Sequence, residues 1–236
     1  MATDVNLLTL TRGELQVTGR LVDASNATLY ATASFEDHSI VCIYKPIAGE
    51  RPLWDFSDGC LAHREYAAYL VSDHLGFDLV PLTILRDGPY GFGMVQQWVH
   101  IDESIDLAKF FATDHPRLRA IALFDAIVNN TDRKIGHLLP VDHEVLFGCD
   151  HGVTFHPEDK LRTVLWQWEQ DELLASEIAT LDLLQNELSS EVGEQIKQLI
   201  TQQEFTALQL RVSRLLATKV FPSPNPDWPA VPWPPF

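Results

Sequence analysis

Alternating apolar and polar positions dominate the first part of the chain and predict a series of short strands. Residues 14–20, 27–34 and 38–44 are rich in β-branched or aromatic side chains and are separated by polar turns, which is typical of an antiparallel meander. The stretch 60–75 contains neither Gly nor Pro, and a stripe of mainly apolar residues recurs along it at helical spacing. One helix is therefore expected after three strands.

Two further strand-like segments follow this helix. Residues 79–86 and 92–99 are largely apolar, and the turn DGPYG between them favours a chain reversal. We therefore expect a small antiparallel sheet that carries one helix and is complete near residue 99.

Beyond this point the apolar residues recur at helical spacing. Two short apolar runs, 137–140 and 144–149, resemble a hairpin. The remaining predicted elements are helices, over 105–111, 115–129, 168–188 and 192–216. Strands followed by helices predict an α+β fold with two lobes, a β-rich lobe over 1–98 and a mainly helical lobe over 99–221.

The segment 222–236 forms a Pro/Trp-rich tail. The last sixteen residues hold seven of the fourteen prolines, which excludes a helix or a central strand. Two interpretations stay open: the tail packs Trp228, Trp233 and Phe236 onto its own body, or it is a recognition segment for a partner.

Charge and composition narrow the classes of function. The chain has 236 residues, with 33 acidic against 17 basic side chains and a net charge of −16, which opposes binding to nucleic acids and to anionic membranes. No apolar run approaches the ~20 residues that span a bilayer, and the first residues lack the pattern of a signal peptide. The three cysteines form no CxxC pair. We expect a folded, soluble, cytoplasmic protein without integral membrane association.

Lys45 is the first candidate for a functional residue. It is the only lysine among the first hundred residues, and it ends a strand of apolar residues. An ammonium at a strand end can project into a cleft and bind phosphate oxygens when a carboxylate holds it. Glu65 in the following helix is a suitable carboxylate, and an ordinary surface ion pair is the alternative.

A denser cluster follows the helix expected over 115–129. It comprises Asp132 and Arg133 in a loop, His137 five residues after Asp132, and Asp150 after the hairpin. Phosphoryl transfer needs one carboxylate that orients the attacking hydroxyl and a second that holds magnesium on the phosphates. Asp132 suits the first role and Asp150 the second, while turn or cap residues are the alternative for either.

Four motifs in order are similar to the phosphatidylinositol 3-/4-kinase superfamily, above all its type II phosphatidylinositol 4-kinases. Residues 124–133, FDAIVNNTDR, resemble the catalytic loop, and CDHG at 149–152 resembles the metal-binding D-x-G. IYKP at 43–46 resembles the lysine strand, and REYAAYL at 64–70 resembles the helix with the pairing glutamate. The whole chain resembles a group of small actinobacterial proteins classed with those kinases.

This resemblance implies a small two-lobed kinase-like fold that binds ATP and Mg²⁺ or Mn²⁺. Lys45 would contact the phosphates, Glu65 would hold Lys45, Asp132 would be the base with Arg133 beside it, and Asp150 would bind the metal. The residues implied to contact the nucleotide elsewhere are the phosphate-loop pair Ser25 and Asn26 and the interlobe connection Gln96, Gln97, Trp98 and Val99.

Two departures from the family pattern bear on activity and on the acceptor. The second metal ligand of the family is an Asn, and His137 stands there; imidazole is a poor ligand for Mg²⁺, so His137 implies one-metal binding, Mn²⁺, or a pseudokinase that regulates a partner. The phosphate loop also lacks glycine. Because no basic patch or amphipathic anchor is evident, a protein or small-molecule acceptor is favoured over a lipid.

Clustered histidines raise a third alternative, a metal-dependent hydrolase. Mixed N/O ligation would draw on histidines and aspartates near the proposed base. The residues concerned are His137, His143, His151, His156, Asp132, Asp142 and Asp150. No HxH or HxxxH pair occurs in this cluster, and a hydrolase would leave Lys45 and Glu65 without a role.

Overall fold

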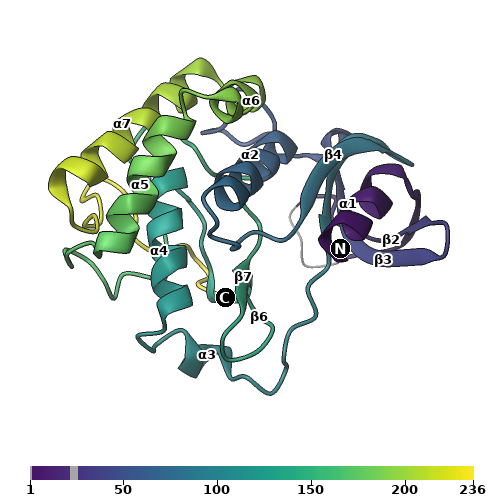
Figure 1. Cartoon of the computed structure of the whole chain (residues 1–236), viewed down its shortest axis with the longest axis horizontal. Helices are drawn as coiled ribbons and strands as arrows, with labels where there is room; N and C mark the ends of the chain where they lie inside the picture. Colours follow the sequence, from purple (N-terminus) through teal and green to yellow (C-terminus); the bar gives the residue numbers. More distant parts are fainter. Residues whose placement is uncertain (1, 22–25) are drawn as a thin grey trace.

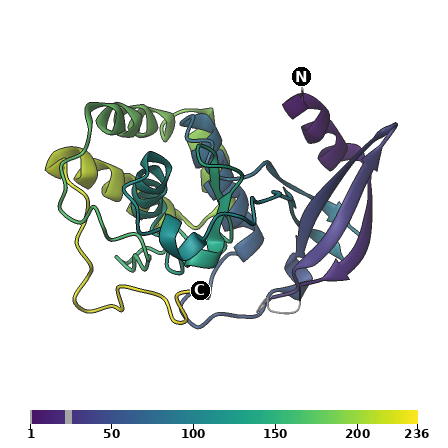
Figure 2. The same cartoon turned by 90° about the horizontal axis from the view of Figure 1, so that it is seen from below.

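The computed structural model describes residues 2–21 and 26–236 and has an antiparallel sheet in the N-terminal part and helices in the C-terminal part (Figure 1). Five antiparallel strands form the sheet in the order β1-β2-β3-β5-β4. Their bounds are β1 Glu14–Arg20, β2 Leu29–Phe35, β3 His38–Pro46, β4 Thr83–Gly88 and β5 Gly91–Gln97. The predicted α+β fold class is confirmed, and Figure 2 shows the sheet at one end of the molecule and the helices of the C-terminal part at the other.

A helix that the sequence did not predict, α1 (Ala2–Arg12), covers one face of the sheet. Its Leu10 is fully buried with alternate residues of β2 and β3, because side chains on one face of a strand repeat every second position. The Arg86 guanidinium on β4 donates hydrogen bonds to the carbonyls of Leu10 and Gly13. The close approach of the backbone at position 13 to the end of this helix requires glycine, since a Cβ on Gly13 would lie 2.5 Å from the Thr9 carbonyl oxygen.

Helix α2 (Leu61–His74) connects the two lobes. The Glu50 carboxylate accepts hydrogen bonds from the amides of Leu61 and Ala62, which satisfies the free N–H groups at the start of the helix. In the same helix, Arg64 donates from Nε to Glu204 at 2.8 Å, and both side chains are buried. This pair fixes α2 to the helical lobe, and α2 also packs on β4 and β5.

The helical lobe forms one large core. Its elements are α3 Leu107–Phe110, α4 Pro116–Val128, β6 Leu138–Pro140, β7 Leu146–Gly148, α5 Ala175–Glu187, α6 Glu191–Leu199 and α7 Gln202–Thr218. The prediction of one helix over 192–216 is wrong, because Thr201 caps a new helix. Its hydroxyl accepts from the Glu204 amide, and the Glu204 carboxylate accepts from the Thr201 amide. Helix α5 also begins seven residues later than predicted.

The tail runs back across the helical lobe and ends beside β6 and β7 (Figure 1). The Ala230 carbonyl accepts hydrogen bonds from the Thr163 amide and the Trp166 indole, and the Pro235 carbonyl accepts from the Ile135 amide. Trp228 packs against the body, whereas Trp233 and Phe236 are 87% and 62% exposed, so the interpretation that all three rings pack onto the body does not hold for these two. A partner of the tail and the lobe boundaries at residues 98 and 221 stay predictions.

Candidate functional site

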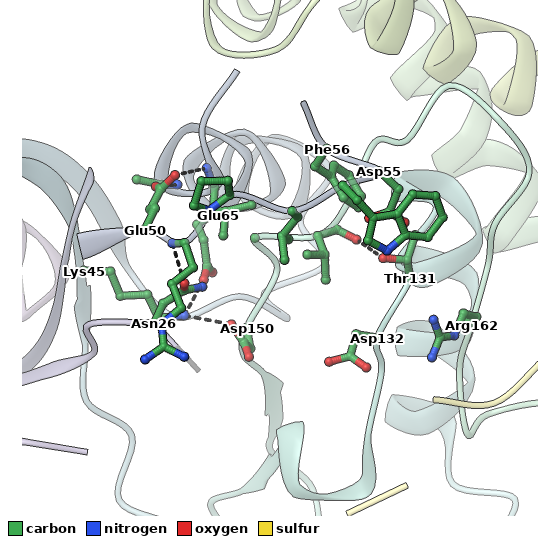
Figure 3. Close-up of a pocket in the computed structure, with 18 of the residues that line it drawn as sticks. Asn26, Lys45, Glu50, Asp55, Phe56, Glu65, Thr131, Asp132, Asp150 and Arg162 are labelled. Atoms are coloured by element: carbon green, nitrogen blue, oxygen red, sulfur yellow. Dashed lines mark hydrogen bonds and ion pairs between the residues drawn. The ribbon is translucent and has the colours of Figure 1, made fainter. Parts of the chain in front are cut away.

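A pocket of about 670 Å³ lies between the sheet and the helical lobe. Figure 3 shows its side chains, which come from β3, from α2, from the loop before α2, and from the loops that follow α4 and β7. The tail also contributes to the lining. Predicted site residues Lys45, Glu65, Asp132 and Asp150 all line this one pocket, as does Asn26.

Lys45 faces the pocket because of its place in β3. Its neighbours Cys42 and Tyr44 are fully buried in the core of the sheet, and the alternation of a strand turns Lys45 to the opposite side. The Lys45 Nζ lies 2.5 Å from Glu65 Oε1 and 2.8 Å from Asp150 Oδ1. Burial lowers the pKa of Lys45, but attraction to both carboxylates outweighs burial and raises this pKa, so the ammonium stays charged.

Glu65 holds the strand and the loop after β7 together. Its side chain is only 2% exposed, and its second oxygen accepts a hydrogen bond of 3.0 Å from the His151 amide. Gly152 allows this approach, since a Cβ there would lie 3.2 Å from the Leu61 Cβ. The predicted pairing of Lys45 with Glu65 is therefore present, within a buried arrangement rather than as a surface ion pair.

Asp150 stands in a strained backbone conformation at the edge of the pocket. Its φ of 60° lies in the left-handed region, which Asp adopts more readily than most residues but still at a cost. The side chain is 52% exposed and directed into the pocket (Figure 3). The Lys45 ammonium holds the pKa of Asp150 well below its ordinary range, so the carboxylate is ionised. An exposed, ionised carboxylate beside an ammonium suits a metal that also binds phosphate oxygens.

The loop that carries Asp132 is fixed by the residues just before it. The Asn130 side chain accepts a hydrogen bond from the Asp132 amide, and it also donates to Asp125 in α4. The Thr131 hydroxyl donates to the Val153 carbonyl. Burial raises the pKa of Asp132, and the nearby ammonium of Lys134, 3.3 Å away, offsets part of this rise.

Arg133 does not lie in the pocket, which corrects its predicted place among the catalytic groups. Its guanidinium is fully buried and bonded to both oxygens of Asp125, to the Cys149 carbonyl and to the His151 ring. Arg133 and Asp132 are neighbours in an extended segment, so one faces the core and the other the pocket. The role of Arg133 is to hold the Asp132 loop and the Asp150 loop in one arrangement.

A second pocket, of about 310 Å³, adjoins the first and shares Lys45 and Asp150 with it. Apolar side chains such as Ile43 contribute much of its wall. The interlobe residues Gln96, Gln97, Trp98 and Val99 all line it, as the prediction for an adenine site requires. The amide of Gln96 is itself engaged, because it donates to the Thr83 hydroxyl. Ser25 falls outside the described residues.

His137 lines the smaller pocket beside Asp150. Burial lowers the pKa of His137 to about 4, so the ring is neutral at physiological pH. Its Nδ1 accepts from the Lys134 amide, which leaves the proton on Nε2, 3.7 Å from Asp150 Oδ2. This pattern favours His137 as a donor toward Asp150 over the predicted role of metal ligand.

The histidines expected in a hydrolase do not converge. His151 is buried against Arg133, His156 bonds with Lys160, and His143 is exposed on the turn between β6 and β7. Across residues 2–21 and 26–236 no group of three or more His, Cys, Asp or Glu side chains is arranged to hold a metal ion.

A curated protein of Mycobacterium tuberculosis (strain ATCC 25618 / H37Rv), Protein Rv2133c, is 41% identical to this chain, over 96% of the chain and 94% of the relative. The chain belongs to the Rv2133c family. No protein-family model matches it.

Two solved kinases resemble this Rv2133c-family protein in structure. A crystal structure of the Golgi casein kinase gives a TM-score of 0.56 at 14% identity and covers 91% of this chain and 73% of its own. The Helicobacter pylori proinflammatory kinase CtkA gives a TM-score of 0.52 at 12% identity and covers 90% and 94%. The fold is therefore kinase-like. No helix in the described part of the chain is long and apolar enough to cross a membrane.

Several residues of the larger pocket were not predicted as part of the site. Arg162 comes from a loop after the hairpin, and Trp54 and Trp228 come from the loop before α2 and from the tail. None of them lies in a periodic pattern or in a motif. One weak signal was present, since each tryptophan lies within two residues of a proline.

Proposed function

We propose that this protein is an ATP- and divalent-cation-dependent phosphotransferase with the site arrangement of the phosphatidylinositol 3-/4-kinase-like type. One observation carries the proposal: the Lys45 ammonium joins a buried glutamate to Asp150, in the same pocket as Asp132. A lysine held by a helix glutamate and set beside a metal-binding aspartate is the arrangement that phosphoryl transfer uses to bind and neutralise phosphates.

The two pockets divide ATP between them. The nucleoside would occupy the smaller, largely apolar pocket, and the phosphates would extend past Lys45 and Asp150, which both pockets share. Asp150 would hold Mg²⁺ or Mn²⁺ together with the phosphate oxygens, and the ion would neutralise charge that develops on the transferred group. Asn26 lies on the side of the larger pocket where a phosphate-covering loop would approach.

Asp132 would act as the general base. The acceptor hydroxyl gives its proton to the Asp132 carboxylate while its oxygen forms a bond to the γ-phosphorus, and the bond from that phosphorus to the β–γ bridging oxygen breaks. ADP leaves with the electron pair of that bond. Because burial raises the pKa of Asp132, this carboxylate is a stronger base than an ordinary exposed aspartate.

The acceptor that we favour is a small molecule or a protein and not a lipid or a nucleic acid. The net charge of −16 opposes approach to anionic membranes and to phosphate backbones. A transfer assay with radiolabelled ATP, with Mg²⁺ or Mn²⁺, and with lipid, protein and small-molecule acceptors tests the proposal. Wild-type protein should transfer label, and Asp132→Asn should slow this transfer by about 10²-fold or more; transfer at an unchanged rate in Asp132→Asn would overturn the role of Asp132.

A regulatory pseudokinase is the second candidate, and His137 is the observation that favours it. His137 stands where an oxygen ligand is expected, and because its Nδ1 accepts from the Lys134 amide, the proton rests on Nε2, the nitrogen that faces Asp150. In the same assay a pseudokinase would bind ATP but transfer no label to any acceptor and none to itself.

A further inference from the structure

The part of the larger pocket beyond Asp132 has no role in the binding of ATP as described. In Figure 3 Asp132 lies between Asp150 and Arg162, so Arg162 is on the far side of the proposed base from the phosphates. The tryptophans Trp54 and Trp228 line this pocket as well. A hydroxyl that reaches Asp132 must approach from this region, because Lys45 and Asp150 occupy the other side.

The Arg162 guanidinium is not paired in a hydrogen bond or ion pair with any of the residues that the structure describes. The Nε of this side chain is buried. Burial raises the pKa of Asp132, and the positive charge of Arg162 acts against this rise. A buried donor without a partner is costly, so an anion that binds Arg162 would recover free energy.

The backbone holds Arg162 firmly beside the catalytic loop. Its amide donates to the Asn130 carbonyl at 2.9 Å, and its carbonyl accepts from the Arg133 amide at 3.0 Å. Thr163 continues this pairing as a parallel bridge to Arg133, and the tail supports it from outside through the Ala230 carbonyl. The position of Arg162 relative to Asp132 is thus set by main-chain hydrogen bonds.

Aromatic rings provide an apolar wall for the same region. The Trp54 and Trp228 rings have centroids 6.3 Å apart, and the Lys160 Nζ lies 5.3 Å and 4.4 Å from their centres. This cation–π contact joins the loop before α2 to the tail. Trp54 remains 81% exposed, so its ring can cover a bound molecule. The loop and the tail, joined in this way, form the border of the pocket. This border favours a compact ligand over an extended polypeptide.

We propose that this region binds the phosphoryl acceptor, and that the acceptor is a small hydroxylated molecule with a carboxylate or phosphate group. Arg162 binds the anionic group, Trp54 and Trp228 cover the carbon skeleton, and the hydroxyl points toward Asp132. This inference rests on the proposed function. In the transfer itself, the acceptor oxygen bonds to the γ-phosphorus, its proton passes to Asp132, and ADP is the leaving group.

Calorimetric titration with sn-glycerol 3-phosphate tests the inference. The protein is first saturated with a non-hydrolysable ATP analogue and Mg²⁺, which occupies the phosphate site at Lys45. Arg162→Gln should weaken binding of the probe about tenfold or more, because a charge-assisted hydrogen bond is lost. Arg162→Lys, which keeps the charge, should lose less, and Arg12→Gln on the exposed face of α1 is the matched control.

Three results would overturn the inference: no binding of glycerol 3-phosphate to the wild type, equal binding to Arg162→Gln, or equal loss in the Arg12→Gln control. A serine-containing acidic peptide forms the second arm. If only the peptide binds in an Arg162-dependent way, the acceptor is not a small molecule. Binding of the ATP analogue is measured separately, so failure of the proposed function appears as absent nucleotide binding and is distinguishable from failure at Arg162.

Discussion

Replacement of Lys45 by methionine should destabilise the fold as well as weaken nucleotide binding. Methionine keeps much of the side-chain volume but leaves the Glu65 carboxylate, 2% exposed, with the His151 amide as its remaining donor. Removal of one partner from a buried ion pair costs about 3–5 kcal/mol. Since Lys45 is 20% exposed and water can reach Asp150, we expect a cost at or just below the lower end of this range, about 2–3 kcal/mol.

A cost of this size should be visible in both thermal and chemical unfolding. For a chain of this length it corresponds to a fall of roughly 5–10 °C in Tm. Burial raises the pKa of Glu65, and loss of the ammonium raises it further. A carboxyl whose pKa is raised in the folded state destabilises the fold fully at pH values above this raised pKa. At pH values below the pKa of the unfolded state it has no such effect. The difference between Lys45→Met and wild type should therefore be largest at neutral pH and shrink toward pH 4.

A double-mutant cycle assigns the loss to the buried carboxylate. In a Glu65→Gln background, Lys45→Met should cost much less, because no buried charge is left without a partner. Lys109→Met is the matched control, since Lys109 is exposed on α3 and forms a surface ion pair with Asp106. An unfolding free energy within about 0.5 kcal/mol of wild type for Lys45→Met, or additive effects in the cycle, would refute this reasoning.

Four further predictions have distinct expected outcomes. Asp132→Asn should leave the unfolding free energy nearly unchanged but lower kcat about 10²- to 10⁴-fold, and transfer by the wild type should fall at acid pH as Asp132 is protonated at its raised pKa. An imidazole titration between pH 5 and 8 is not expected at His137, whose pKa is about 4; NMR of the ring would detect one. Arg133→Lys should cost about 3–5 kcal/mol, read from denaturant unfolding, because Asp125 loses its bidentate partner in the core. His137→Asn should shift the metal preference toward Mg²⁺, and an unchanged ratio of Mg²⁺- to Mn²⁺-supported transfer would contradict this.

Patterns of local spacing predicted much of the fold. The five strands and α2 follow from alternation and helical stripes, which report on the burial of one face. Helix α1 was missed because its segment contains three threonines, which are weak helix formers, and tertiary contacts of Leu10 and Arg86 stabilise it. The break between α6 and α7 could have been read from the capping pair Thr201 and Glu204.

Site residues that lie in the ordered motifs were predicted, whereas site residues that come together through contacts between loops were missed. Lys45 and Glu65 were paired correctly because each lies on a regular element. Arg133 was misplaced, since sequence does not tell which of two neighbours in a loop faces the core. Arg162 and Trp228 come together only through long-range pairing of a loop and the tail, which no local pattern encodes.

The central claim is that Lys45 and Asp150 receive the phosphates of ATP beside the base Asp132. A crystal structure with a non-hydrolysable ATP analogue and Mn²⁺, located by its anomalous scattering, tests this most directly. We predict the nucleoside in the pocket formed with residues 96–99, phosphate oxygens on the Lys45 ammonium, and Mn²⁺ bound to Asp150. A nucleotide bound elsewhere, or Mn²⁺ away from Asp150, would contradict the account.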